Sequence, residues 1–228
     1  MNWFEQLKST FLEDNRYMWM VEGLGNTLLI TLGALVIGVI IGTIVAVTKY
    51  YCEGNRKLRF LNWLCNCYTT VIRGIPITVL LLLFFFVIFV FARNGLPVAI
   101  AAFGINSGAY MAELIRGGIN SVDKGQMEAA RSLGLSKGQA MMKVVLPQAI
   151  KYILPAIGNE CIALLKETSV AGYVAVVDIT KAATNIRNKT YDAVNPIILL
   201  AIVYLGMVVG LTRLLTLLER RLNKGNGK

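Results

Sequence analysis

The sequence consists of long stretches without charged side chains, separated by shorter charged connections. The first of these stretches lies between Glu22 and Lys49 and holds 26 residues. As a helix it would be about 39 Å long, which exceeds the ~30 Å hydrocarbon core of a bilayer. The same pattern recurs along the chain and predicts five membrane-spanning helices, at residues 23–48, 74–92, 96–114, 147–165 and 193–212.

The sequence leaves the start of the second span open. Residues 60–72 are also largely apolar, but Arg73, Gly74 and Pro76 separate them from the uncharged run that follows. The span therefore begins either near residue 74 or near residue 60. In both cases the pattern predicts an all-α integral membrane protein.

The composition agrees with a membrane protein. Only 16% of the residues are charged and 56% are hydrophobic, whereas an ordinary soluble domain has roughly 25% charged residues. The net charge is +10, but the basic residues lie between the apolar runs and do not form the basic face expected of a nucleic-acid-binding domain. The charge therefore carries information about membrane topology.

The distribution of Lys and Arg predicts which side of the membrane each connection occupies. Connections 49–59, 116–151 and 213–228 together contain 15 of these residues, and the connections on the opposite side contain 7. By the positive-inside rule, the N-terminus is outside and the C-terminus inside. We expect residues 1–22 to form an outer segment and residues 23–228 to form a single transmembrane domain.

The outer segment has apolar side chains at helical spacing, at Trp3, Phe4, Leu7 and Phe11. This spacing favours a short helix that lies flat on the outer membrane interface. A frayed polar lead-in is an equally open alternative, because a helix this short is weak in isolation.

Several kinds of chemistry are excluded by residues that the chain lacks. It has no histidine, the most common general base and metal ligand, and its four cysteines contain no C-x-x-C pair. It also has no G-x-x-x-x-G-K-[S/T] phosphate-binding loop. We therefore expect no catalytic residue, no metal and no cofactor on this chain, and an enzyme is the least favoured class.

Residues 116–146, on the predicted inner side, are expected to form two short helices joined by a tight corner. The first, Met127–Leu133, would end at Gly134, which adopts the left-handed conformation easily. Ser136 and Gln139 have the spacing of a capping box and would start the second helix. Pro147 is expected to break that helix after Leu146.

This loop carries a family resemblance. The pattern Glu128-Ala129-Ala130, Gly134, Val144 and Leu146-Pro147 resembles the Glu-Ala-Ala loop of ABC importer permeases, with Val144 where that family usually has isoleucine. Other segments resemble the polar amino-acid branch of the family, with Ile75 where Thr is usual and Glu167 where Asp is usual. These segments are Arg73-Gly74-Ile75-Pro76, residues 109–116, Lys124-Gly125-Gln126 and residues 165–169.

The resemblance implies a type I, MetI-like permease fold in the bacterial cytoplasmic membrane. It implies a partnership with two ATP-binding subunits that hold ATP and Mg, with a second permease copy or a sister permease, and with an extracytoplasmic binding protein that delivers a polar amino acid. The docking residues for the ATPase would then be Glu128, Ala129, Ala130, Gly134, Leu146 and Pro147. Glu128 would supply a charged contact, the alanines a close approach and Gly134 the turn.

Ionisable residues inside spans are costly and mark candidate positions on a substrate pathway. Glu160 and Glu167 are seven residues apart and lie on one helix face, where they would bind an ammonium group. The alternative is that a basic residue elsewhere in the bundle pairs with Glu160.

A second polar stripe lies on the third span, where Asn106, Tyr110, Glu113 and Gly117 share one face. The stripe is a candidate pathway lining, but the favoured role for Glu113 is an ion pair with Arg116, three residues away. For Arg73, the favoured role is structural, with its side chain extending to headgroups or to the inner helices.

Two other classes of function stay open at this level. A secondary transporter would use Glu160 or Glu167 to carry a coupled proton, and its uptake would survive removal of ATP. A membrane scaffold would use the inner loop to bind a partner and would show no substrate-dependent activity.

Overall fold

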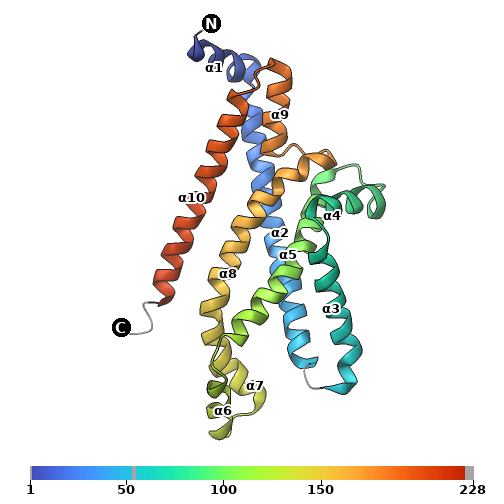
Figure 1. Cartoon of the computed structure of the whole chain (residues 1–228), viewed down its shortest axis with the longest axis vertical. Coiled ribbons are helices and arrows are strands. Elements are labelled where there is room, and N and C mark those ends of the chain that lie inside the picture. Colours follow the sequence, from blue (N-terminus) through green and yellow to red (C-terminus); the bar gives the residue numbers. More distant parts are fainter. Residues whose placement is uncertain (1, 53–54, 224–228) are drawn as a thin grey trace.

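The computed structural model describes residues 2–52 and 55–223, and every regular element in them is helical (Figure 1). The α-helices are α1 Trp3–Phe11, α2 Tyr17–Cys52, α3 Arg59–Gly74, α4 Ile77–Leu83, α5 Gly95–Asn120, α6 Lys124–Ser132, α7 Lys137–Ala140, α8 Leu146–Glu167, α9 Ile179–Thr190 and α10 Asn195–Asn223. Shorter 3-10 turns lie at Glu13–Asn15, Arg56–Leu58 and Thr168–Val174, and π-helical turns lie at Phe84–Ile88 and Met141–Val145.

Four of the predicted spans correspond to helices that are long and apolar enough to cross a membrane. The first is longer than expected, because α2 begins at Tyr17 and runs for 36 residues. The second span differs in kind. It is a bent pair, residues 56–74 and 77–88, with an angle of 107° between its two parts. The structure thus has an earlier start for this span, near residue 60, and a break where the prediction of 74–92 placed one helix.

The break in the second span follows from Pro76. A proline disfavours helical geometry in the residue before it, and Ile75 is extended, with φ −99° and ψ 129°. The carbonyl of Pro76 then accepts the first hydrogen bond of α4 from the amide of Leu80, at 3.0 Å. The chain therefore leaves α3 part-way through the bundle and continues at a steep angle.

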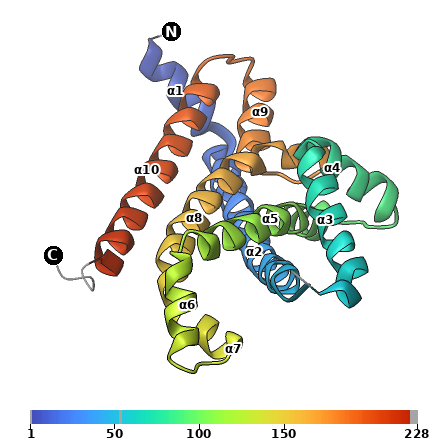
Figure 2. The ribbon, with the colours of Figure 1, turned by 60° about the horizontal axis from the view of Figure 1, so that its bottom comes forward.

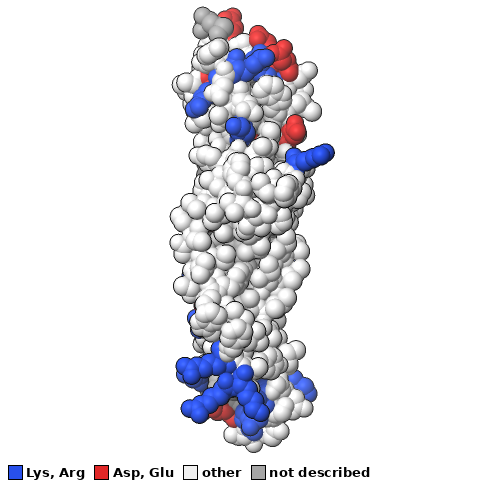
Figure 3. All heavy atoms as spheres, turned by 90° about the vertical axis from the view of Figure 1, so that its right-hand side faces the viewer, with Lys and Arg blue, Asp and Glu red and all other residues white. Residues whose placement is uncertain are grey.

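The four long helices and the bent pair alternate in direction, so α1 and α9 lie at one end of the bundle and α6 and α7 at the other (Figure 1). We call these the N-terminal end and the elbow end. Charged side chains gather at both ends, and a broad middle band carries none on the face seen in Figure 3. This distribution fits a protein whose middle lies in lipid.

The centre of the bundle is a close contact between α2 and α5. Glycines on each helix face the other: a Cβ added at Gly38 would lie 2.8 Å from the Ser107 hydroxyl, and one at Gly104 would lie 2.7 Å from Ile37. Small residues let two helix backbones approach in this way. In contrast, Gly206 and Gly210 on α10 have no neighbour within 4 Å of such a Cβ.

The N-terminal segment is an ordered helix that packs on the chain between α9 and α10. The Thr10 hydroxyl donates a 2.8 Å hydrogen bond to the Asp192 carboxylate, and the Trp3 indole donates to Asn195 at 3.2 Å. Phe11 is buried, whereas Trp3 and Phe4 are 61% and 71% exposed. The frayed alternative is therefore wrong, and α1 presents aromatic side chains outward at the N-terminal end.

Candidate functional site

The exposed feature at the elbow end is formed by residues 124–145, which we call the elbow (Figure 2). Its first helix, α6, starts where the Asp123 carboxylate accepts a hydrogen bond from the amide of Gly125, at 2.7 Å. The helix is three residues longer at its start than the predicted Met127–Leu133. A side-chain cap at Asp123 satisfies an amide that would otherwise lack a partner.

The corner of the elbow has the predicted left-handed glycine. Gly134 has φ +86°, its amide donates to the carbonyl of Arg131, and the amide of Leu135 donates to the carbonyl of Ala130. This pair of hydrogen bonds is the Schellman arrangement that ends helices at glycine. The corner is therefore fixed by backbone hydrogen bonds as well as by the glycine.

The second half of the elbow begins with the predicted capping box. The amide of Ser136 donates to the Gln139 side chain at 2.9 Å, and the amide of Gln139 donates to the Ser136 hydroxyl at 3.3 Å. The predicted break at Pro147 is absent, because the helical path continues through it into α8. A π-helical turn at residues 141–145 widens the helix just before Pro147, and the proline occupies the first turn of α8, where no amide is needed.

The predicted docking residues occupy different environments on the elbow. Glu128 and Ala129 are exposed, but Ala130 is buried at 4% exposure and faces the elbow's own interior. The nearby Leu133 is 85% exposed and was not among the predicted docking residues. The sequence does contain a sign of this exposure, since Leu133 is an apolar residue directly before the glycine that ends the helix. Leu146 is half-buried and Pro147 exposed, both at the start of α8.

The elbow is fixed to the bundle by apolar packing. Val145 is buried in a cluster with Ile115 of α5 and Ile153 of α8, and Met127 and Met141 pack against this cluster. The Gln148 side chain also donates to the Gln126 side chain at 3.2 Å. The elbow therefore packs directly against α5 and α8, the two helices that lead into and out of it.

Inside the bundle, Glu160 of α8 lies beside α5. The Ser107 hydroxyl donates to the Glu160 carboxylate at 3.3 Å, and this carboxylate also interacts electrostatically with Arg73 and Glu167. The Arg73 guanidinium lies over the ring of Tyr110, at 5.1 Å from its centroid. Arg73 thus makes a packing contact with α5, which agrees with a structural role, and its described partner is Tyr110 and not the inner helices; its extension to headgroups stays a prediction.

The other predicted pathway residues do not all lie together. Glu167, at the last turn of α8, is half-buried and lies within electrostatic range of Glu160. Asn106 is buried at 3% exposure, next to Ser107. The structure thus brings Glu160, Glu167 and Tyr110 toward one polar region, whereas Glu113 has other partners.

Glu113 is held by two basic residues near the elbow end. Its carboxylate accepts hydrogen bonds from Arg116 at 2.6 Å and from Lys49 at 2.7 Å. The predicted ion pair with Arg116 is confirmed. The contact with Lys49 of α2 was not predicted, because it depends on how two helices distant in sequence pack together.

Among the described residues, no group of three or more His, Cys, Asp or Glu side chains is placed to hold a metal ion. What the structure offers is a rigid exposed elbow connected to a charged polar interior within a helical membrane bundle. A family model described as "binding-protein-dependent transport system inner membrane component" matches residues 23–224. The chain belongs to this family.

The protein is therefore a multi-pass permease subunit of an ABC transporter in the inner membrane. A separate ATPase handles ATP, and a binding protein is part of the transport system. Family membership assigns energy coupling to that ATPase, which removes the ion-gradient and scaffold alternatives. It also agrees with the expectation that the permease itself is not an enzyme and holds no cofactor.

Curated relatives cover nearly the whole permease. It is 35% identical to the arginine transport system permease protein ArtQ of Bacillus subtilis (strain 168) over 211 residues, which are 91% of this chain and 94% of the relative. It is 36% identical to the probable glutamine ABC transporter permease protein GlnM of the same organism over 217 residues, 94% and 98% of the two chains.

Solved structures resemble the permease in fold. A chain in a crystal structure of an amino acid ABC transporter with histidines is 40% identical, with a TM-score of 0.84 and coverage of 92% of this chain and 98% of that one. A chain of the inward-facing MetNI methionine ABC transporter has a TM-score of 0.78 at 21% identity, covering 90% and 97%. The second likeness concerns the fold alone.

Proposed function

We propose that the permease imports a polar amino acid by alternating access, with the elbow end in the cytoplasm and the N-terminal end outside. The positive-inside distribution of Lys and Arg supports this orientation. The substrate class is supported by the similarity to permeases named for arginine and glutamine transport.

The elbow is proposed as the docking element for the ATPase. Its exposed Glu128, Ala129 and Leu133 form one chemically mixed face, with a charge, a small residue and an apolar side chain. Its Schellman corner and capping box make it stiff, so closure of the ATPase pair would displace it as a unit. The hydrogen bonds of the corner and of the capping box are the observations that carry the proposal, because a loop without them would absorb the displacement.

The assembly is proposed to contain two permease subunits and two ATP-binding subunits. The most apolar stretch of α10 has no buried residue within this chain, and Gly206 and Gly210 have open space in front of them. A second permease, either a copy or a sister chain, would cover part of this surface. The number of elbows, and hence of ATPase subunits, would then be two.

The polar region around Glu160 is proposed as the substrate contact within the membrane. Glu160 and Glu167 offer carboxylates to an ammonium group, and the ring of Tyr110 with Asn106 would complete the lining. Such groups inside a span are usually functional, because their burial is costly. The ligand must contact the inward and outward states differently for transport to be coupled.

Reconstitution tests the proposed function. The permease is combined with its ATPase and its binding protein in liposomes, and ATP hydrolysis is measured with arginine, glutamine, histidine and an apolar amino acid in turn. We expect at least one polar amino acid to stimulate hydrolysis and to accumulate inside. If the loaded binding protein left hydrolysis unchanged for every polar amino acid, the proposal would be wrong.

A further inference from the structure

The face of α3 that carries polar residues is not explained by the fold. Asn62, Asn66, Thr70 and Arg73 follow one another at intervals of four, four and three residues, so they share one side of the helix. Asn66, Thr70 and Arg73 are exposed within the chain. With Arg59 placed at the membrane surface of the elbow end, Arg73 lies about 21 Å deeper along α3, which is inside the ~30 Å hydrocarbon core.

A charged side chain at this depth does not face lipid but a partner or a water-filled space. The opposite side of α3 carries exposed apolar side chains, as a lipid-facing surface does, since Phe60 and Val71 are 70% and 54% exposed. The polar face lines a groove between α3 and α5.

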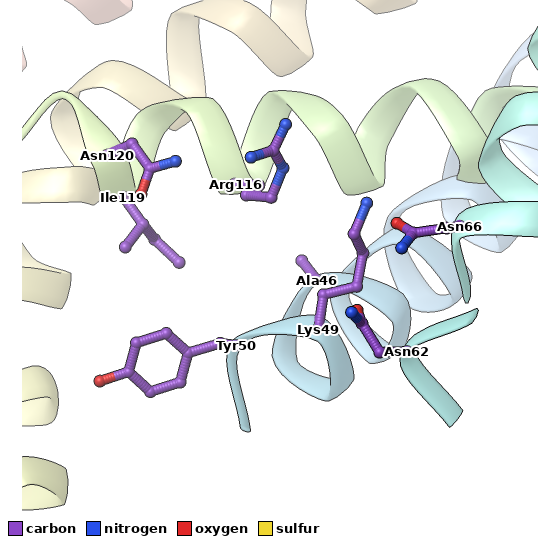
Figure 4. Close-up of a pocket in the computed structure, with 8 residues that line it drawn as sticks. All are labelled: Ala46, Lys49, Tyr50, Asn62, Asn66, Arg116, Ile119 and Asn120. Carbon is purple, nitrogen blue, oxygen red and sulfur yellow. The ribbon is translucent and has the colours of Figure 1, made fainter. Parts of the chain in front are cut away.

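Two adjoining pockets trace this groove. The first has a volume of about 280 Å³ and is lined by residues of α2, α3 and α5 (Figure 4). In this view Lys49 extends from α2 toward Asn66 of α3, with Arg116 on α5 nearby. The second pocket continues along α3 as far as Arg73 and shares Lys49, Asn66 and Arg116 with the first.

The groove is electropositive. Its described lining contains three basic side chains, Lys49, Arg73 and Arg116, and one acidic side chain, Glu113. Beyond the elbow-end pocket, Lys137 lies over the ring of Tyr50 at 5.2 Å, which adds a further positive charge, and Asp123 lines the adjoining pocket beside Asn120. Such a groove concentrates anions and disfavours free cations.

We propose that this groove is the path by which the amino acid leaves toward the elbow end, and that Lys49 and Arg116 form a carboxylate-binding station on it. In this conformation the carboxylate of Glu113 occupies the station, at 2.7 Å from Lys49 and 2.6 Å from Arg116. Glu113 therefore acts as a resident stand-in for the carboxylate of the solute, which displaces it during release. This inference rests on the proposed import function and extends it to the release step.

Charged thiol reagents test the groove in the assembled transporter. Thr70→Cys, on the polar face, and Val71→Cys, one residue along on the lipid face, are made in a background with Cys52, Cys65, Cys67 and Cys161 replaced by alanine or serine. Each variant is labelled with two methanethiosulfonate reagents, one that carries an anionic sulfonate and one that carries a cationic trimethylammonium group. The labelling rate of each reagent is divided by the rate at which the same reagent reacts with a free thiol in solution.

We expect Thr70→Cys to react at least about fivefold faster with the sulfonate than with the cation, as an electropositive cleft raises local anion concentration by about tenfold or more. Glu113→Gln should raise the sulfonate rate further, because it removes the competing carboxylate. Equal normalised rates for the two reagents at Thr70→Cys, or equal labelling of Thr70→Cys and Val71→Cys, would overturn the inference.

Uptake in the cysteine-intact protein provides a second test that does not depend on the cysteine-free background. Lys49→Gln with Arg116→Gln should lower amino-acid uptake per ATP hydrolysed by about tenfold, the loss of one charge-assisted interaction. Lys57→Gln with Arg59→Gln, two exposed basic residues outside the groove, is the matched control. Equal uptake by the two double variants would contradict the inference, whereas failure of the proposed function itself would show as unstimulated hydrolysis in the unmodified transporter.

Discussion

The Ser107 hydroxyl of α5 donates a hydrogen bond to the Glu160 carboxylate of α8 at 3.3 Å. These two helices are the ones that enter and leave the elbow, so the contact joins the candidate substrate region to the element proposed to bind the ATPase. A change in the angle between α5 and α8 alters the surroundings of Glu160 directly. This relationship gives the proposed coupling a physical route through two rigid helices.

Replacing Glu160 with glutamine removes a charge from the candidate substrate contact and keeps the size of the side chain. A hydrogen bond to a charged group contributes about 1.5–3 kcal/mol, so uptake should fall roughly 10- to 100-fold for an amino acid whose ammonium binds there. The measurement is uptake by the reconstituted transporter at several substrate concentrations. Ser107→Ala removes only the neutral hydrogen-bond donor to Glu160 and should lower uptake less. Normal uptake by the Glu160→Gln variant would exclude the ammonium contact.

Gly134→Ala should loosen the elbow without any steric clash. Its Cβ would have open space around it, but φ is +86°, where a residue with a side chain pays about 1–2 kcal/mol. We expect trypsin to cut after Arg131 and Lys137 at least about fivefold faster in this variant. Gly138→Ala also has open space, at a helical position, and should be cut no faster than the unmodified protein; similar rates for the two variants would argue against a strained corner at Gly134.

The N-terminal anchor should be sensitive to acid through Asp192. Burial alone would raise the pKa of this carboxyl, but hydrogen bonds from Asn195, Thr10 and the amide of Val194 outweigh it and hold the pKa below its ordinary value. The stabilisation is therefore complete above the ordinary pKa of about 3.9 and is lost as pH falls through the lower folded-state value.

Asp192→Asn tests this anchor by thermal unfolding in detergent. At pH 7 it should lower the free energy of unfolding by about 1–3 kcal/mol, because a charged acceptor is lost. The difference from the unmodified protein should shrink below about pH 4. Glu22→Gln, at an exposed acid of the same end, should have a smaller effect at pH 7. A difference for Asp192→Asn that widened in acid would contradict the assigned sign.

Leu133→Ser tests the apolar part of the docking face. Leu133 is 85% exposed, so the substitution leaves the permease core intact. Burial of a leucine side chain at an interface contributes about 1.5–3 kcal/mol, and affinity for the ATPase should fall about tenfold or more. Leu12→Ser, an exposed leucine at the N-terminal end, is the control; equal ATPase binding by both variants would exclude Leu133 from the interface.

The features predicted correctly from sequence are those that depend on short stretches of chain. Long apolar runs identify the spans, the glycine at 134 fixes a corner through its own backbone, and Ser136 with Gln139 forms a capping box within four residues. Each signal is local, so no knowledge of packing is needed.

What sequence analysis missed depends on contacts between distant helices. Lys49 meets Glu113 across 64 positions, Ser107 meets Glu160 across 53, and Arg73 stacks on Tyr110 of another helix. Such contacts require the rotation and depth of each helix, which hydropathy does not specify. The Pro147 error has a different and local cause: a π-helical turn at residues 141–145 leads directly into α8, and the proline lies in the first turn of that helix.

The most direct test of the central claim is Glu128→Arg, a charge reversal on the exposed face of the elbow. The purified permease carrying this substitution is mixed with its ATPase, and co-purification and stimulated ATP hydrolysis are measured together. Glu22→Arg, an exposed acid at the opposite end of the bundle, serves as the control. We predict that Glu128→Arg inserts normally but loses the ATPase, while Glu22→Arg retains it; an unchanged ATPase complex with Glu128→Arg would contradict the assignment of the elbow as the docking element.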